Sequence, residues 1–234
     1  MSGLVPTVFV VDDSSEVRGA LTRVLSIAGY TVRTFDSAER FLEDRDPRAP
    51  GCLLLDLCMP GLSGLELQGE LRKLGCSWPI VFLTGMGDIQ MGVNAMKRGA
   101  VDFLTKPIDS VLLFDAVDQA LRRDALQRVE GAVRTAIRRR FDTLTPRERQ
   151  VMAQVIRGRL NKQIAADLGT GEKTVKVHRA RVMSKMEARS IAELVQLAGR
   201  VGIAIEPVLS NSSAAFGWLM PKSHCTRAET ALEA

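Results

Sequence analysis

Short apolar runs alternate with amphipathic stretches through the first half of the chain. Five runs are too short for helices and predict strands, at residues 7–11, 31–34, 52–55, 80–83 and 102–104. After several of them apolar side chains recur at helical spacing, most clearly over residues 17–28, 65–74 and 112–121. Strand–helix pairs in this order predict an α/β domain with a parallel sheet covered by helices on both faces.

The second half has a different period, which is helical throughout from residue 143 to residue 200. Thr145 is expected to cap a first helix, with Pro146 at its first position and Glu148 three residues after the cap. Three more helices are expected: a short one capped by Asn161, one over residues 172–186 and one from Ser190. The pattern therefore predicts a separate all-α domain of four helices.

These changes of period place the domain boundaries. The first domain is expected at residues 5–122, a basic helical linker at 123–142, the second domain at 143–200 and a tail at 201–234. The tail has serines but no apolar period, so we expect it to be disordered. A length of 234 residues suits two domains.

Charge is distributed unevenly between these segments. Residues 1–122 carry 12 Lys and Arg against 16 Asp and Glu, whereas residues 123–200 carry 18 against 8. A segment this basic favours a polyanion as its partner, although a solvated basic surface without a ligand would have the same charge.

The remaining composition excludes several classes of protein. The apolar runs are too short to span a membrane, and the first residues lack a basic leader, so we expect a cytoplasmic protein with no membrane partner. The four cysteines and two histidines lack the spacing of a zinc site or of a disulfide framework.

Polar side chains stand at the carboxyl ends of four of the five predicted strands. Asp12 and Asp13 follow the first strand, Asp56 the third and Thr84 the fourth, and Lys106 comes shortly after the fifth. In parallel sheets ligands bind beyond this edge. Any one of these residues could be an ordinary loop residue, but together they predict a site.

Three carboxylates on one rim repel one another, so this cluster requires a cation. Oxygen ligands that are open to solvent favour Mg²⁺. With the charge balanced by a metal and by Lys106, Asp56 can act as a nucleophile toward a phosphoryl group, and Thr84 can donate to a phosphoryl oxygen. The rim therefore favours formation of an aspartyl phosphate.

Four motifs in this half, together and in order, resemble the receiver domain of bacterial two-component response regulators. They are Asp12-Asp13, DLCMPGLSG from Asp56, Thr84-Gly85 and Lys106-Pro107. The resemblance covers residues 5–122 and implies a flavodoxin-like fold with a five-stranded parallel sheet in the order 2-1-3-4-5. It also implies that Asp56 takes a phosphoryl group from a sensor histidine kinase.

The resemblance assigns roles to the residues around Asp56. The implied Mg²⁺ ligands are Asp12, Asp13, Asp56 and the main-chain carbonyl of Cys58. Asp12 is expected to act through water. Lys106 and Thr84 are expected to contact the phosphoryl group, and Thr84 and Phe103 to move together on phosphorylation. Without the resemblance, core packing would be the simpler interpretation of Phe103.

Two positions near the phosphoryl group bear on its lifetime. Cys58 lies two residues after Asp56, and Met86 lies two residues after Thr84. Neither side chain has a carboxylate or amide that could orient an attacking water. We therefore expect slow self-dephosphorylation.

The predicted helix over residues 172–186 has two different faces. At about 100° per residue, its apolar side chains gather on one side; they are Val175, Val182, Met183 and Met186. The opposite side carries Lys176, Val177, Ala180, Arg181 and Ser184. Small and basic residues on one face suit a helix in the major groove of DNA, although a solvated amphipathic helix would show a similar pattern.

Residues that flank this face are candidates for contacts with DNA phosphates. They are Asn161, Lys162, Lys173, Thr174, His178, Arg179 and Lys185. The base-facing candidates are Lys176, Val177, Ala180 and Arg181.

Three stretches of the second half resemble the LuxR-type helix-turn-helix of the NarL/FixJ response regulators, and the FixJ branch most. They are LTPRERQV from Leu144, GRLNKQIA from Gly158 and KTVKVHRARV from Lys173, and the resemblance covers residues 143–199. It implies that the third helix reads bases and that the fourth helix mediates dimerisation. Gly171 stands where a serine commonly caps the third helix, a change that costs only a few tenths of a kcal/mol.

Together the two resemblances imply a response regulator that controls transcription, as an activator. Phosphorylation is expected to promote a homodimer, through the face of the fourth helix, fifth strand and fifth helix, and sequence-specific binding to double-stranded promoter DNA. RNA polymerase is then a further partner.

Two other classes of protein are weighed against this one. A Mg²⁺-dependent phosphatase that works through an aspartyl phosphate would need an acid where Cys58 stands, so we expect no turnover of external substrates. A LuxR-type regulator that senses a small molecule would need a ligand pocket in its first domain, where the strand ends carry acids instead.

Overall fold

The computed structural model describes residues 5–85 and 89–202. The chain divides into two compact units between Thr145 and Pro146. The predicted disordered tail falls almost entirely outside the described residues.

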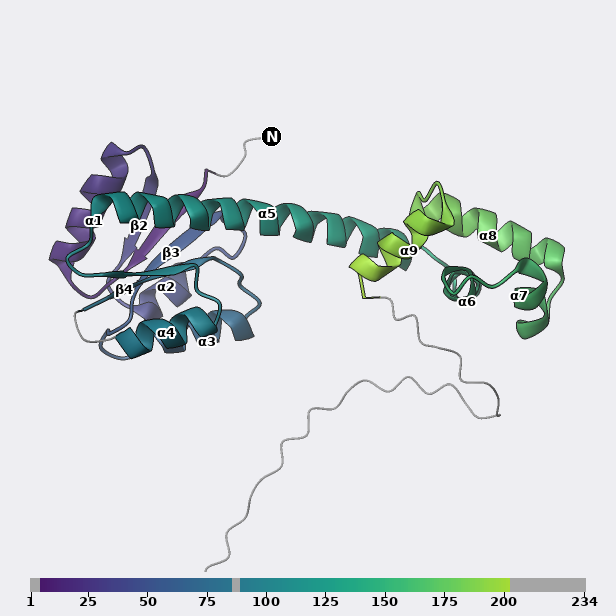
Figure 1. The fold of residues 1–234 in the computed structure, drawn as a ribbon, viewed down its shortest axis with the longest axis horizontal. Coiled ribbons are helices and arrows are strands. Elements are labelled where there is room, and N and C mark those ends of the chain that lie inside the picture. The colour runs from purple at the N-terminus through teal and green to yellow at the C-terminus, as the bar shows by residue number, and fades with distance from the viewer. Residues whose placement is uncertain (1–4, 86–88, 203–234) are drawn as a thin grey trace, which may run out of the picture. The chain divides into compact units, whose positions relative to one another are not determined.

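The first unit is built on one parallel sheet (Figure 1). Its strands are β1 (Thr7–Val11), β2 (Thr31–Phe35), β3 (Gly51–Asp56), β4 (Ile80–Thr84) and β5 (Asp102–Thr105). The order is β2-β1-β3-β4-β5, with Val10 paired to both Thr34 and Leu54. The flavodoxin-like order is confirmed, and each strand forms where the apolar runs predict it.

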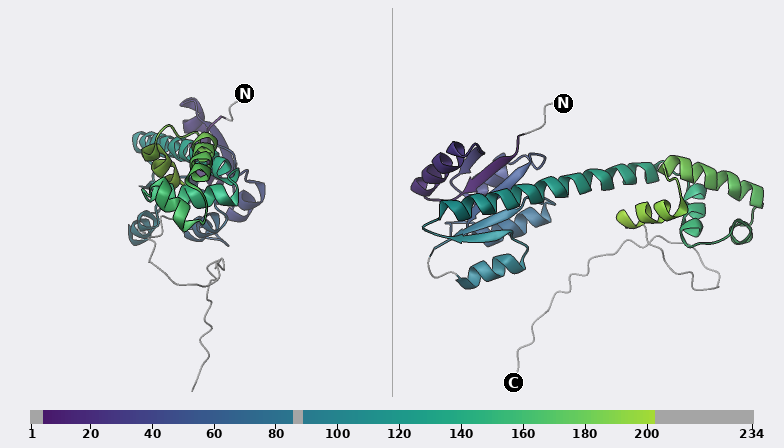
Figure 2. Two further views of the ribbon diagram at one scale, coloured as in Figure 1. Left: turned by 90° about the vertical axis from the view of Figure 1, so that its right-hand side faces the viewer. Right: turned by 45° about the horizontal axis from the view of Figure 1, so that its top comes forward.

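Helices cover both faces of the sheet (Figure 2). They are α1 (Ser15–Ile27), α2 (Ala38–Asp44), α3 (Gly64–Lys73), α4 (Ile89–Lys97) and α5 (Ser110–Asp142). Leu53 and Leu55 of β3 pack with side chains from α2, α3 and α4, whereas Cys52 and Leu54 pack with α1 and α5. Burial on both faces explains why the strands are continuous apolar runs rather than alternating ones.

Side-chain hydrogen bonds cap the N-termini of α1 and α3, the helices that follow Asp13 and Asp56. The hydroxyl of Ser14 accepts from the N–H of Val17 at the start of α1. At the start of α3, Ser63 Oγ accepts from the N–H of Glu66, and Glu66 Oε2 accepts from the N–H of Ser63. This capping box satisfies two orphan donors and ends the loop that follows Asp56.

The fifth helix is longer than its apolar period alone predicts. The pattern marks a helix to about Leu121, but α5 continues without a break from Ser110 to Asp142, over 33 residues. The segment expected as a basic helical linker is thus the second part of α5 (Figure 2).

The second unit holds four helices in its described part. They are α6 (Pro146–Ile156), α7 (Asn161–Asp167), α8 (Glu172–Met186) and α9 (Ile191–Arg200). The predicted all-α domain is confirmed. No helix among the described residues is both long and apolar enough to cross a membrane.

One predicted cap is wrong. Asn161 is the first residue of α7, and Leu160 occupies the cap position. The N–H of Leu160 donates to Gln163 Oε1 at 3.0 Å, while Asn161 Oδ1 accepts from Arg179 of α8. The sequence pattern assigned the Asn161 side chain to capping α7, but in the structure it binds Arg179 of α8 instead.

Candidate phosphoacceptor site and DNA-facing helix

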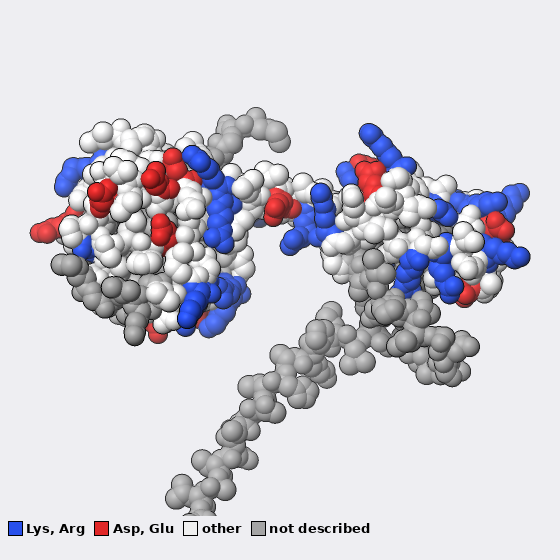
Figure 3. All heavy atoms as spheres, in the orientation of Figure 1, with Lys and Arg blue, Asp and Glu red and all other residues white. Residues whose placement is uncertain are grey.

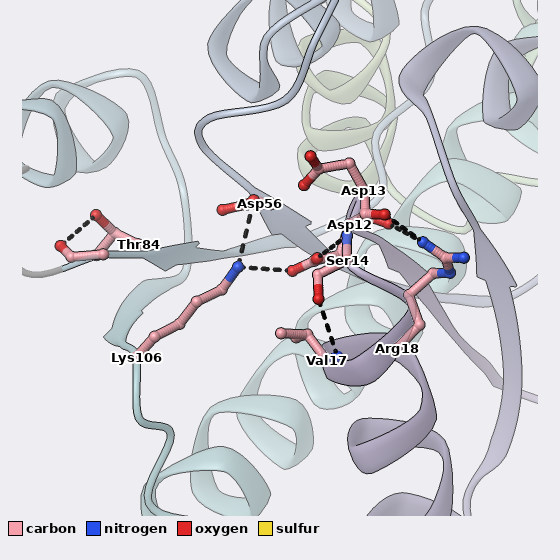
Figure 4. Close-up of polar contacts among 9 residues, drawn as sticks. Asp12, Asp13, Ser14, Val17, Arg18, Asp56, Thr84 and Lys106 are labelled. Carbon is pink, nitrogen blue, oxygen red and sulfur yellow. Dashed lines mark hydrogen bonds and ion pairs between the residues drawn. The ribbon is translucent and has the colours of Figure 1, made fainter.

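The three predicted carboxylates converge at the carboxyl edge of the sheet (Figure 4). One carboxylate oxygen from each of Asp12, Asp13 and Asp56 lies within 4.8 Å of the others. Asp12 and Asp56 are buried, and Asp13 is exposed. Strand pairing causes this convergence, because β1 and β3 are parallel neighbours that end side by side.

Lys106 bridges the two buried carboxylates (Figure 4). Its Nζ lies 2.8 Å from Asp12 Oδ2 and 3.3 Å from Asp56 Oδ2. The N–H of Lys106 donates to the carbonyl of Thr84 at 2.8 Å, and the Lys106–Pro107 peptide bond is cis. The lysine, which directly follows β5, is therefore held beside Asp56 at the end of β3, as the sequence predicts.

The electrostatics of Asp56 depend on this lysine. Burial raises the pKa of the Asp56 carboxyl, and the charge of Asp12 raises it further, whereas Lys106 and the N–H of Cys58 lower it. Burial lowers the pKa of Lys106, but its bond to Asp12 and the charge of Asp56 outweigh burial and raise that pKa overall. The site is a negatively charged cluster, buried at Asp12 and Asp56 and exposed at Asp13, that one lysine only partly balances.

The loop after β1 is held by a residue that the sequence analysis missed. Arg18 Nη1 donates to the carbonyl oxygens of Asp12 at 2.7 Å and of Asp13 at 2.9 Å. The N–H of Ser14 donates to Asp12 Oδ1 at 2.9 Å. The sequence gives little sign of this role: it shows only an arginine in the first turn of a helix that follows two acids. The partners of Arg18 are main-chain atoms, which the sequence does not specify.

The loop after β3 needs a glycine close to Asp56. A Cβ at Gly64 would lie 2.2 Å from the carbonyl oxygen of Asp56, which is far inside van der Waals contact. Glycine therefore lets α3 begin against the main chain of Asp56. Cys58, two residues after Asp56, is exposed in this loop.

Thr84 and Phe103 lie on the neighbouring strands β4 and β5. Thr84 is buried, and its hydroxyl donates to the carbonyl of Gly85 at 3.3 Å rather than to the lysine–aspartate group (Figure 4). Phe103 is partly buried against the core cluster that contains Phe82. Met86 lies outside the described residues.

Helix α8 has the two faces that its sequence predicts. Val175, Val182 and Met186 are fully buried, and Met183 is partly buried. Among the DNA-facing candidates, the exposed residues are Lys162, Lys173, Thr174, Lys176, Val177, Ala180 and Arg181. Lys and Arg side chains predominate over acidic ones on the visible surface of this unit (Figure 3). The exposed face of α8 is therefore available to a polyanion.

Other candidates make contacts inside the unit. Arg179 Nη1 donates to Asn161 Oδ1 at 2.9 Å, which orients both side chains. Lys185 Nζ lies 2.7 Å from Oε2 of Glu148, a buried residue of α6. His178 is partly buried. The Lys185 ammonium balances this buried carboxylate, and that role opposes the predicted contact of Lys185 with a DNA phosphate.

Both units match known families. Residues 8–118 match the family described as response regulator receiver domain, and residues 142–198 match the family described as bacterial regulatory proteins, luxR family. The chain belongs to the LuxR-type two-component response regulators. The resemblance drawn from the sequence motifs is confirmed.

This response regulator has close relatives along most of its length. It is 46% identical to nodulation protein W of Bradyrhizobium diazoefficiens over 84% of this chain and 87% of that protein. It is 43% identical to the transcriptional regulatory protein FixJ of Azorhizobium caulinodans, over 84% and 93%. The solved structure of the response regulator StyR matches with 49% identity and a TM-score of 0.73, covering 84% of this chain and 99% of that one.

A receiver domain joined to a LuxR-type DNA-binding domain makes this response regulator a transcriptional regulator of a two-component system. Its class consists of transcription factors rather than enzymes that turn over an external substrate, so the phosphatase alternative is set aside. The alternative of a small-molecule sensor is set aside as well, because the first domain is a receiver.

Proposed function

We propose that Asp56 is the phosphoacceptor of this response regulator, and that a sensor histidine kinase is the phosphoryl donor. The observation that carries the proposal is the convergence of Asp12, Asp13, Asp56 and Lys106 at one edge of the sheet. Asp56 ends the central strand β3, so its carboxylate is fixed by the sheet. Lys106 is placed to offset charge on the transferred oxygens.

The acidic cluster fits Mg²⁺. All three side-chain donors are carboxylate oxygens, which this cation prefers, and the exposure of Asp13 leaves room for water and phosphate oxygens. Asp12, Asp13, Asp56 and the carbonyl of Cys58 would hold the ion. A bound Mg²⁺ would neutralise charge as the phosphoryl group is transferred. Arg18 fixes the main chain that carries Asp12 and Asp13.

Phosphorylation is proposed to act through Thr84 and Phe103. In the structure the Thr84 hydroxyl donates to Gly85, so a turn toward a phosphoryl oxygen on Asp56 would break that bond. The neighbouring ring of Phe103 is partly buried and could change its burial at the same time. Such a shift would favour a homodimer and thereby binding to two half-sites of promoter DNA.

The exposed face of α8 is the proposed DNA contact. Lys176, Val177, Ala180 and Arg181 would face base edges. Lys162, Lys173, Thr174, Asn161, His178 and Arg179 would contact phosphates. The bond between Asn161 and Arg179 supports this assignment, because it fixes the guanidinium before DNA binds. Recruitment of RNA polymerase, as an activator, completes the proposal.

Acetyl phosphate should label the protein only when Mg²⁺ is present. Chelation of the metal is expected to slow labelling by more than about 100-fold, since metal ions stabilise transferred phosphoryl charge by several kcal/mol. Added Mg²⁺ should restore it. Phosphate-affinity gels measure the labelled fraction. Asp36→Asn removes an exposed aspartate that follows β2 and serves as a control that should label normally. Equal labelling with and without Mg²⁺ would contradict the proposal.

Once formed, the aspartyl phosphate should persist for much longer than seconds. Cys58 is two residues from Asp56, and its thiol cannot orient water as a carboxylate or an amide does. The decay of labelled protein after removal of acetyl phosphate measures this lifetime. Cys58→Asn, which introduces an amide at an exposed position, is expected to shorten it. A lifetime of seconds in the wild type would refute slow self-dephosphorylation.

A further inference from the structure

An ion pair with a buried carboxylate ties the second part of α5 to the receiver, at the amino end of β3, the opposite end of that strand from Asp56. Asp124 is only 4% exposed although it lies on a helix that continues for several more turns. Its Oδ2 accepts from the N–H of Gly51 at 2.9 Å and from Arg128 Nε at 2.6 Å. The carboxylate thus joins α5 to the first residue of β3.

Arg128 extends this contact to the segment before β3. Its Nη1 donates to the carbonyl of Arg48 at 2.9 Å, and its Nη2 donates to the carbonyl of Ala49 at 2.5 Å. The indole N–H of Trp78 donates to the same Ala49 carbonyl at 2.9 Å. The guanidinium of Arg128 therefore binds a carboxylate of its own helix and two carbonyl groups of the segment before β3. Only the planar, multidentate side chain of arginine offers this geometry.

The contact has little freedom to shift. A Cβ at Gly51 would lie 1.9 Å from the carbonyl oxygen of Thr7, so β3 begins in close contact with β1. Most exposed i,i+4 ion pairs contribute little, and Arg122 with Asp118 is such a pair, at 3.9 Å. Asp124 and Arg128 differ because the carboxylate is buried and the partners are main-chain groups 70 or more residues away in sequence.

We propose that Asp124 and Arg128 are positioning residues for the output of the response regulator. They make residues 123–128 part of the receiver, so that this stretch of α5 cannot move independently of it. They also connect α5 to the start of β3, the strand that ends at Asp56. A change at Asp56 then acts on a helix, α5, that is anchored to the receiver at Asp124 and Arg128 rather than free to pivot. Only this last step rests on the phosphorylation proposed above.

The test uses the full chain with Arg128→Ala and, because that change leaves a buried charge unpaired, also Asp124→Asn. The amide introduced by the second change keeps an acceptor for Gly51 but lacks the charge that holds Arg128. In both variants amide hydrogen exchange over residues 123–134 should be at least about tenfold faster, as expected when a segment opens locally. Labelling of Asp56 by acetyl phosphate should stay within about twofold of wild type, whereas the gain in DNA affinity on phosphorylation should disappear. Arg122→Ala, in the exposed pair, is the matched control and should change none of these.

Two results would overturn the proposal. Exchange over residues 123–134 equal to wild type in both variants would mean that the pair does not hold the helix. Faster exchange with the full gain in DNA affinity retained would mean that it holds the helix without positioning the output. If the wild type itself gained no affinity on phosphorylation, the proposed function would fail, and hydrogen exchange alone would still decide whether the pair holds the helix.

Discussion

An Asp56→Asn variant should gain no DNA affinity when it is incubated with acetyl phosphate and Mg²⁺. The carboxamide is nearly the same size as the carboxylate but cannot attack a phosphoryl group, so the active form is not favoured. The wild type should gain about 5- to 150-fold, the usual range of coupling between two sites. Fluorescence anisotropy measures this on DNA fragments that are recovered by genome-wide footprinting of the wild type.

The same footprinting with Asp56→Asn tests the switch in cells, where occupancy is expected to fall at most sites. Asp36→Asn, the same change at an exposed aspartate outside the cluster, should leave occupancy unchanged. Identical occupancy for wild type and Asp56→Asn would argue against control by phosphorylation.

A Lys176→Ala variant should lose affinity for its specific sites but much less for unrelated DNA. Lys176 is exposed on α8, and its ion pair with Glu172 at 3.5 Å is an exposed one that the side chain can leave readily. A contact from lysine to guanine acceptors is worth about 1–3 kcal/mol, which corresponds to a loss of roughly 5- to 150-fold. Binding titrations at several salt concentrations measure both the affinity and its salt dependence.

The salt dependence separates two roles for this lysine. If Lys176 contacts a phosphate, the slope of log affinity against log salt should become shallower by about one unit in the variant. An unchanged slope would mean that Lys176 contacts bases and no phosphate. Lys73→Ala, at an exposed lysine of α3 in the receiver, is the control. An equal loss on specific and unrelated DNA would refute base reading by Lys176.

The carboxyl-edge site is predictable from sequence because topology brings its members together. Asp12 and Lys106 each follow a strand and Asp56 ends one, and parallel strands place their carboxyl ends on one edge. The prediction therefore needs only the order of strands and helices. The buried face of α8 is predictable for a similar reason, since helical periodicity alone selects Val175, Val182 and Met186.

Other contacts have no comparable signal. Arg18, Arg128 and Asp124 bond to main-chain groups of other segments, and main-chain atoms carry no sequence code. Asn161 looked like a helix cap because its type and position suit one, but Arg179 of α8 holds its side chain. A local preference worth about 1 kcal/mol is readily overridden by a tertiary contact.

The sequence by itself determined the order of the elements, the two-domain plan and the set of acids at the carboxyl edge. These depend on apolar periodicity and on chain order, which are local properties. Only the tertiary structure decided which charged side chains form ion pairs with buried groups inside a unit and which stay exposed. Lys185, which pairs with Glu148, is of the first kind, and Lys176 is of the second. The physical reason is that a charged side chain pairs with whichever group folding brings within about 3 Å of it. That partner is often remote in the chain.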